Sequence, residues 1–97
     1  MGMTIEEILN KYHVGMYVKF IMEWRGSVHK IIAIDKDIAI VTLKRVFEFS
    51  IEDEEIIENA PEEYYPLISL QGNEIVNKKQ LVDWGIITKS VDFIIGE

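Results

Sequence analysis

The chain has 97 residues with 17 acidic and 10 basic side chains, so its formal net charge is −7 at neutral pH. This acidity disfavours a general nucleic-acid binder, because affinity for phosphate backbones depends mainly on Lys and Arg, and the absence of Cys excludes disulfides and thiol catalysis. No apolar run is long enough to span a membrane and no signal-peptide pattern opens the chain, so we expect a single cytoplasmic domain over residues 1–97.

The first predicted element is a short helix that begins after Thr4. Thr4 and Glu7 have the spacing of a capping box, in which each side chain accepts a hydrogen bond from the backbone of the other residue. We expect Gly15 to end the helix region. Apolar residues repeat with helical spacing and should cover one end or face of a sheet; they are Ile5, Ile8, Leu9 and Tyr12.

Residues 14–51 are predicted to form consecutive β-strands on which the rest of the chain packs. The strands are expected at residues 16–24, 27–34, 38–43 and 46–51, which alternate in polarity or are rich in β-branched side chains. The predicted turns are Arg25-Gly26, residues 35–37 and Lys44-Arg45. The inward positions predict one shared core, formed by Val18, Phe20, Ile32, Val41, Leu43, Phe47 and Phe49.

Short strands joined by tight turns predict a strongly twisted antiparallel sheet. The expected fold class is therefore α+β, mainly β, with an N-terminal and a short C-terminal helix. An SH3-like barrel is the first interpretation, because closure would hide the strand edges. A flatter sheet covered by helices is the alternative. The barrel core would span residues 14–58, and residues 59–97 would pack on it as a C-terminal extension.

Seven acidic residues lie between Glu52 and Glu63 without an intervening Lys or Arg. Residues 52–58 fit either a last strand or a helix capped by Ser50, and both interpretations stay open. Such a cluster keeps a local field within a Debye length of about 8 Å at physiological salt. Its candidate partner-binding residues are Glu54, Glu55, Glu58 and Glu62. The alternative is a face that only keeps the protein soluble.

The segment after the acidic residues contains two prolines. Pro61 and Pro66 exclude a continuous helix between them. Tyr64 and Tyr65 either cap an open barrel end or contact a partner. Residues 67–70 are predicted to form a short strand that is followed by a turn at 71–73.

The C-terminal part has a second set of helix signals. Asn77 is a good N-cap with Gln80 at its third position, so we expect a helix over residues 78–84. Gly85 should end it in a Schellman motif, with Leu81 and Ile86 in apolar contact. Residues 91–95 are predicted to form an apolar strand that pairs with a sheet edge.

Four short segments resemble the small phage- and mobile-element-encoded proteins of the YopX-like kind. They are Gly15-Met-Tyr-Val18, Ile31-Ile-Ala-Ile-Asp35, Pro66-Leu67 and Leu81-Val-Asp-Trp-Gly-Ile86. The resemblance implies an SH3-like barrel and a mobile-element origin, hence a location in the cytoplasm of a host cell. It implies no active site.

No catalytic pattern stands out among the side chains. His13 and His29 are the only histidines, and we expect structural or surface roles for both. Nucleophile-elbow and phosphate-loop patterns are absent from the sequence, so we expect no enzyme, cofactor or metal site. Trp24 and Arg25 lie at the predicted tip of the first hairpin and belong to residue types enriched in interfaces. The alternative is that Trp24 folds back onto the core.

The predicted function is a small acidic interaction module that binds a protein partner. In its sharper form, the protein is an inhibitor or antidefence factor that presents its acidic surface to a nucleic-acid enzyme. One alternative is a nucleic-acid-binding barrel that uses Lys44, Arg45, Lys78 and Lys79. The other alternative is a structural subunit that forms a homodimer through an edge strand.

Overall fold

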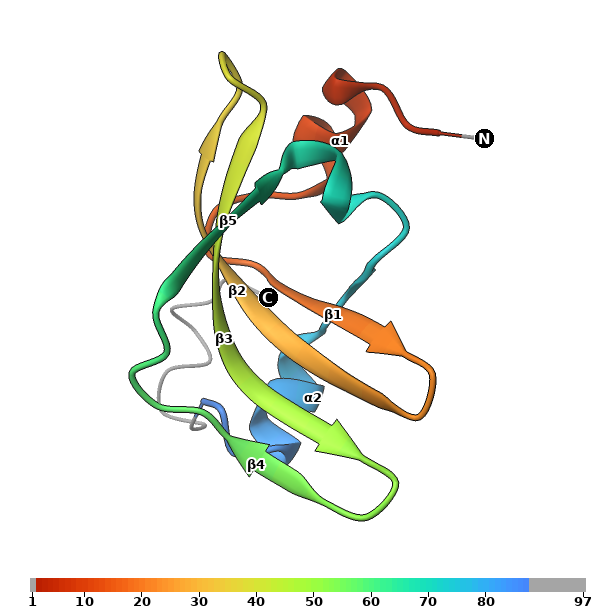
Figure 1. Ribbon diagram of the computed structural model, residues 1–97, viewed down its shortest axis with the longest axis vertical. Coiled ribbons are helices and arrows are strands. Elements are labelled where there is room, and N and C mark those ends of the chain that lie inside the picture. The colour runs from red at the N-terminus through yellow and green to blue at the C-terminus, as the bar shows by residue number, and fades with distance from the viewer. Residues whose placement is uncertain (1, 88–97) are drawn as a thin grey trace.

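A computed structural model describes residues 2–87, which form a six-stranded antiparallel sheet with two short α-helices and a 3-10 helix (Figure 1). The α+β, mainly β class is therefore confirmed. The elements are α1 (Ile5–Lys11), β1 (Tyr17–Met22), β2 (Arg25–Asp35), β3 (Ile40–Ser50), β4 (Glu54–Ile56), β5 (Glu62–Pro66), η1 (Leu67–Leu70), β6 (Glu74–Ile75) and α2 (Lys78–Asp83).

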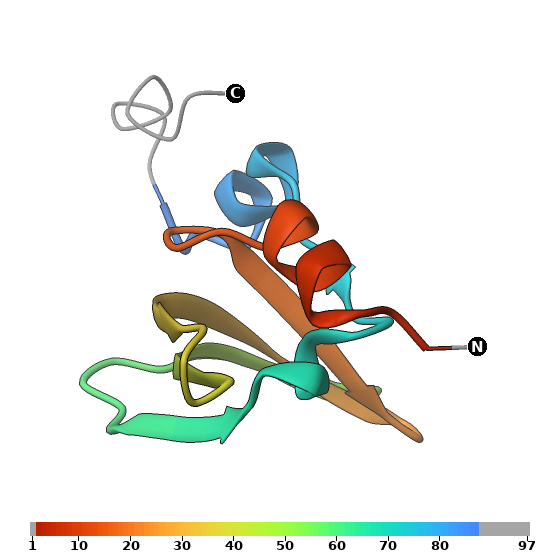
Figure 2. The ribbon, with the colours of Figure 1, turned by 90° about the horizontal axis from the view of Figure 1, so that it is seen from above.

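The strand order in the sheet is β4-β3-β2-β1-β6, and β5 pairs with the remaining half of β3. On its outer edge β3 thus pairs with β4 through residues 47–49 and with β5 through residues 40–44. Figure 2 shows how strongly the sheet twists between β1 and β5. Within residues 2–87 the border strands β4 and β6 do not pair, so the sheet is not closed and the barrel is not confirmed.

Both helices begin, and α2 ends, as their local sequence signals predict. The expected end of α1 at Gly15 is wrong, because α1 ends at Lys11 and Gly15, at φ 95°, lies in the turn before β1. Thr4 accepts a hydrogen bond from the Glu7 backbone (3.1 Å), and the Thr4 backbone donates to the Glu7 carboxylate (2.8 Å). Asn77 and Gln80 form the same reciprocal box at α2. Gly85, at φ 81°, donates to Val82 (3.0 Å), and the next backbone N–H donates to the carbonyl of residue 81 (2.9 Å). These two bonds form the predicted Schellman motif.

The expected turn at Lys44-Arg45 is wrong, because β3 continues through both residues. The register pairs His29 with Arg45 and Val28 with Phe47, so Val46 is the extra residue of a β-bulge. A bulge reverses the in-and-out alternation beyond it. The odd-numbered side chains of β3 therefore lie on one face of the sheet before Val46 and on the other face after it.

The single predicted core is consequently two clusters. The first joins α1 and η1 to the sheet through Ile8, Tyr12, Val18, Ile31, Val41, Leu43, Leu67 and Leu70, with Phe20 partly buried against it. The second joins α2 to the sheet through Tyr17, Val28, Phe47, Val76 and Leu81, with Phe49 partly buried against it. Tyr17 and Val18 are consecutive in β1, so the clusters lie on opposite faces. Ile32 is half-buried and is part of neither cluster.

The first hairpin turns two residues earlier than predicted. Met22 pairs with Arg25, so the turn consists of Glu23, at φ 53°, and Trp24. Gly26 lies inside β2 and has a packing role, because a Cβ atom there would lie 2.5 Å from the Phe49 ring.

Three other segments differ from the prediction or decide between its alternatives. Residues 54–56 form strand β4, which settles the helix-or-strand alternative for this segment in favour of a strand. Residues 62–66 form β5, a strand that we did not predict. Residues 67–70 form η1 and not a strand, because a 3-10 turn places Leu67 and Leu70 on the same side, where both are buried. The predicted strand at 91–95 lies outside the described residues.

Candidate functional site

Two hairpins border a groove at one end of the sheet. Arg25 of β2 lies opposite Ser50 of β3, so the β1–β2 and β3–β4 hairpin tips are neighbours and point to the same side (Figure 1). The groove between them has a volume of about 410 Å³. We call it the hairpin-end groove; it is lined by Met22, Trp24, Arg25, Gly26, Ser27, Arg45, Glu48, Phe49, Ser50, Asp53, Glu54 and Glu55.

Trp24 does not fold back onto the core. It is 60% exposed, and its neighbour Met22 is 57% exposed. The Arg25 guanidinium lies 6.0 Å from the centre of the Trp24 ring, within the range of a cation–π contact. An exposed aromatic side chain and an exposed thioether thus lie together at the mouth of the groove.

The structure brings together four of the eight predicted partner-binding residues. Trp24, Arg25, Glu54 and Glu55 all line the hairpin-end groove. Glu58 borders a separate hollow of about 560 Å³.

The remaining three predicted residues lie on β5, which pairs with the other half of β3. Tyr64 is 69% exposed and does not cap a barrel end, whereas Tyr65 is half-buried against the first cluster. Glu62 lies opposite Lys44. None of the three lines the hairpin-end groove.

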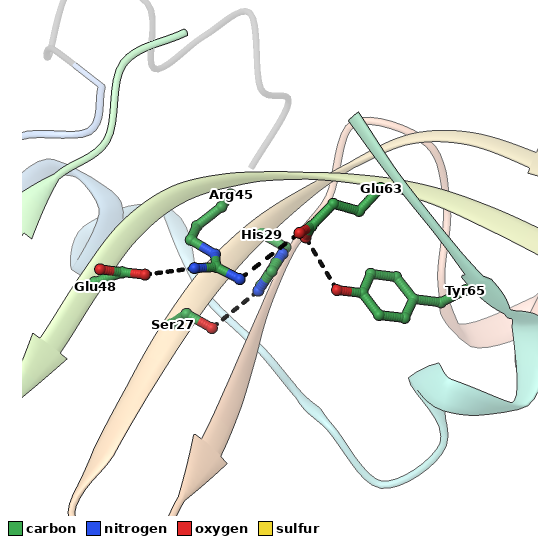
Figure 3. A network of polar contacts seen from close by, with 6 residues as sticks. All are labelled: Ser27, His29, Arg45, Glu48, Glu63 and Tyr65. Atoms are coloured by element: carbon green, nitrogen blue, oxygen red, sulfur yellow. Dashed lines mark hydrogen bonds and ion pairs between the residues drawn. The ribbon is translucent and has the colours of Figure 1, made fainter. Parts of the chain in front are cut away.

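A polar network lies beside the hairpin-end groove (Figure 3), and three of its residues, Ser27, Arg45 and Glu48, also line the groove. The Arg45 guanidinium lies 2.6 Å from Glu48 and 3.8 Å from Glu63, and the Tyr65 hydroxyl donates to Glu63 (3.0 Å). The Ser27 hydroxyl lies 2.9 Å from His29 Nε2. We did not predict this network. One signal was available, because Ser27 and His29 are two residues apart and therefore lie on the same face of a strand.

The network also changes the interpretation of the acidic stretch. Arg45 places a base between Glu48 and Glu63, although the sequence from 52 to 63 contains none. Lys44 lies opposite Glu62 in the sheet. Within the acidic stretch, Glu54 and Glu55 on the rim of the hairpin-end groove therefore keep their charge without an ion pair among the described residues.

His29 is only 4% exposed and its ring meets Phe20 edge-on at 4.9 Å. Burial lowers the pKa of His29, and the nearby Arg45 charge lowers it further, against weaker opposing effects of Glu63 and Glu48. Burial also raises the pKa of Tyr65, and its hydrogen bond to Glu63 adds to this shift. The network therefore contains a neutral imidazole and a neutral phenol at neutral pH.

A neutral histidine beside a serine hydroxyl is the pair of groups that nucleophilic serine catalysis uses. A working base also needs a group that orients its other ring nitrogen. His29 Nδ1 is buried and has no hydrogen-bond partner in the described part of the chain. Among the described residues the arrangement therefore lacks the third member of a triad, and we interpret the network as a structural feature beside the groove.

The bases of the nucleic-acid alternative are partly neutralised. Arg45 is paired with Glu48 and Glu63, and Lys79 lies 2.9 Å from Asp83. Lys44 and Arg45 are consecutive in β3, so their side chains point to opposite faces. Among residues 2–87, no group of three His, Asp or Glu side chains is arranged to hold a metal ion.

Comparisons with protein-family models, with curated proteins and with solved structures find no match to this chain. The YopX-like resemblance therefore stays a prediction. No helix among the described residues has the length and apolar character that crossing a bilayer requires. The geometry of the hairpin-end groove is thus the main basis for a functional proposal.

Proposed function

We propose that this protein is a small non-enzymatic interaction module that binds a protein partner through the hairpin-end groove. The observation that carries the proposal is the exposed pair Trp24 and Met22 at the mouth of a concave, partly polar surface. Trp and Arg are enriched where binding energy is concentrated in protein interfaces. An exposed Trp and an exposed Met in one patch also favour binding over a purely solvated surface.

The partner should present a basic surface. Four acids line the groove, Glu48, Asp53, Glu54 and Glu55, against two bases, and one of these bases, Arg45, is already paired with Glu48. The remaining negative field would steer a positively charged partner and speed its association. Nucleic-acid enzymes carry such surfaces, so the proposal extends to an inhibitor or antidefence factor of mobile-element origin that acts in the host cytoplasm.

The test is affinity capture from the host with matched variants of the full chain. Trp24→Ala should reduce capture of the specific partner, because it removes the exposed aromatic anchor. Tyr64→Ala is the control, since it removes a similarly exposed aromatic side chain outside the groove. The proposal would be contradicted if both variants lost capture of the partner equally, or if neither variant lost it.

The charge component needs its own pair of variants. Glu54→Gln with Glu55→Gln should slow association with the captured partner and flatten its dependence on salt. Glu6→Gln with Asp37→Asn makes the same change in net charge at two exposed sites outside the groove. If both double variants change the salt dependence equally, only the overall charge matters and the groove is not the binding surface.

A further inference from the structure

Strand β4 lies at the border of the sheet and turns half of its backbone groups outward. Ser50 donates to Asp53 (2.8 Å) and Ile57 donates to Val46 (2.9 Å), so odd-numbered residues of this segment bond to β3. In an antiparallel pair the backbone groups alternate between the two sides. Those of Glu54 and Ile56 therefore point away from β3, toward the border of the described sheet.

Hollows lie on both faces of this border strand. Glu55 lies opposite Glu48, on the face of the hairpin-end groove. Ile56 and Glu54 lie opposite Phe47 and Phe49, on the other face. Ile56 borders the hollow of about 560 Å³, whose lining includes apolar residues such as Ile86 and also the bases Lys30 and Lys44. A strand added beside β4 would direct its side chains alternately toward these two faces.

We propose that the protein binds its partner by strand addition, with an extended partner segment pairing antiparallel to β4. The segment carries basic side chains on the face of Glu48 and Glu55 and apolar side chains on the face of Ile56. This inference rests on the proposed function and deepens it by naming the partner's chemistry. Main-chain hydrogen bonds would supply general affinity, and the two contrasting faces would supply specificity.

Charge complementarity selects this partner over a second copy of the same chain. Two β4 strands paired edge to edge would place Glu54 and Glu55 of one copy beside the same acids of the other. Like charges opposite each other in a sheet are destabilising. A segment of alternating basic and apolar residues meets Glu48 and Glu55 on one face, and on the other face it meets the exposed Ile56 beside Glu54.

The probe is a short synthetic peptide of strictly alternating Arg and Val, added to the isotope-labelled full chain at low salt. Amide NMR should show shifts at Glu54, Glu55 and Ile56 and at the Trp24 indole. A peptide of the same composition with Arg and Val in two blocks should give about tenfold weaker binding. Equal binding of both peptides would mean that only charge attracts them, and would overturn the proposal.

Backbone methylation of the peptide tests the hydrogen bonds directly. In antiparallel addition the residues opposite Glu54 and Ile56 bond to β4, and these are the Val positions. N-methylation of the Val residues should abolish binding, whereas N-methylation of the Arg residues should leave it intact. If both methylated peptides bind, or neither does, edge pairing of this kind is wrong.

A charge reversal supplies a rescue. Glu55→Lys should fold, because it replaces a like-charge pair with Glu48 by an attractive one. The variant should bind the Arg–Val peptide about tenfold more weakly and should gain binding to a Glu–Val peptide. Unchanged preference for the Arg–Val peptide would place the basic side chains on the other face and overturn the assignment.

Hydrogen exchange separates failure of this inference from failure of the proposed function. Strong protection of the Ile56 amide in the free protein would show that the edge is already covered, and would overturn strand addition. If capture of the native partner depends on Trp24 and the complex leaves Ile56 unprotected, strand addition is wrong and the proposed function stands. If capture is indifferent to every groove variant, the proposed function itself is wrong.

Discussion

The same strands build a closed end and an open end of one sheet face. Toward α1 and η1 the side chains of Val18, Ile31 and Leu43 are fully buried under helical residues. Toward the hairpin tips, the β1 residues of this face pass from Val18, which is fully buried, through Phe20, which is half-buried, to Met22, which is 57% exposed. The strands thus extend beyond what α1 and η1 cover, and the hairpin-end groove occupies the uncovered length.

A polar boundary separates the two ends. Ser27, His29 and Arg45 follow directly along the strands from the apolar cluster, and their partners Glu48 and Glu63 come from the same sheet face. Most buried polar atoms in proteins are paired, and in this boundary two buried nitrogens, His29 Nδ1 and Arg45 Nε, have no hydrogen-bond partner among the described residues. The open end is therefore a differently built surface, whose charge and shape can be used for recognition, and not merely the edge of an incomplete core.

The sharpest way to test this contrast is to truncate one side chain at each end. Leu43→Ala, in the closed end, should lower the free energy of unfolding by about 2–5 kcal/mol. The side chain is fully buried, and its truncation leaves a cavity that the neighbouring side chains fill only in part. Met22→Ala, at the open end, should change it by about 0.5 kcal/mol or less. Chemical denaturation of both variants measures the difference. Similar losses would mean that the hairpin end is packed in solution.

A glycine at the open end should be far less tolerant than its exposed neighbours. Gly26→Ala would place a Cβ atom 2.5 Å from the Phe49 ring and 2.8 Å from the Phe20 carbonyl oxygen. Since one contact is with backbone, we expect a loss of about 1–3 kcal/mol in unfolding free energy. Gly72→Ala has open space around it and tests only its positive φ of 80°. A thermal melt unchanged by Gly26→Ala would contradict the tight packing of β2 on Phe49.

The polar boundary should make stability sensitive to pH. Burial lowers the pKa of His29 from its usual 6.5, so below that pH the unfolded chain binds a proton that the folded chain does not. Stability should hold above about pH 6.5 and fall below it, by at most about 1.4 kcal/mol per pH unit, until the folded-state pKa is reached. Urea denaturation between about pH 7 and about pH 5.5 avoids most carboxylate titration.

The matched variant for this pH effect is His29→Gln. An amide can still form a hydrogen bond with Ser27 but does not titrate. The difference in unfolding free energy between the wild type and the variant therefore isolates the contribution of His29. Parallel pH profiles for the two proteins would show that His29 is not held neutral by the fold.

The parts of the fold that could be predicted depend on neighbours in sequence. The boxes at Thr4 and Asn77 and the ending at Gly85 each involve residues within five positions, so their patterns are complete in the sequence. The bulge at Val46 is not visible in this way. Phe47 and Phe49 continue the apparent alternation of β3, and only pairing with β2 reveals the extra residue.

The candidate site could also be predicted only in part from the sequence. Trp24, Arg25, Glu54 and Glu55 stood out by residue type, and the groove joins them because the two hairpins are neighbours. The contact of Arg45 with Glu63 was not predictable, because it requires β5, which contains two acids and a proline and has little strand character in sequence. Pairing with β3 overrides that weak propensity.

The smallest expected effect on stability comes from two acids on the strands that flank β3. Glu55 lies opposite Glu48, a like charge, whereas Glu62 lies opposite Lys44, an opposite charge. Glu55→Gln should therefore raise the unfolding free energy by roughly 0.2–0.5 kcal/mol, and Glu62→Gln should lower it by a similar amount. Both effects should fade at about 1 M salt, where the Debye length is only about 3 Å. Each variant removes one of the chain's excess negative charges, so a general relief of self-repulsion would stabilise both. If denaturation at low salt shows that the unfolding free energies of the two variants change in the same direction, net charge outweighs the cross-strand pairs. The acids at the open end would then have no local energetic role that distinguishes them from those on β5.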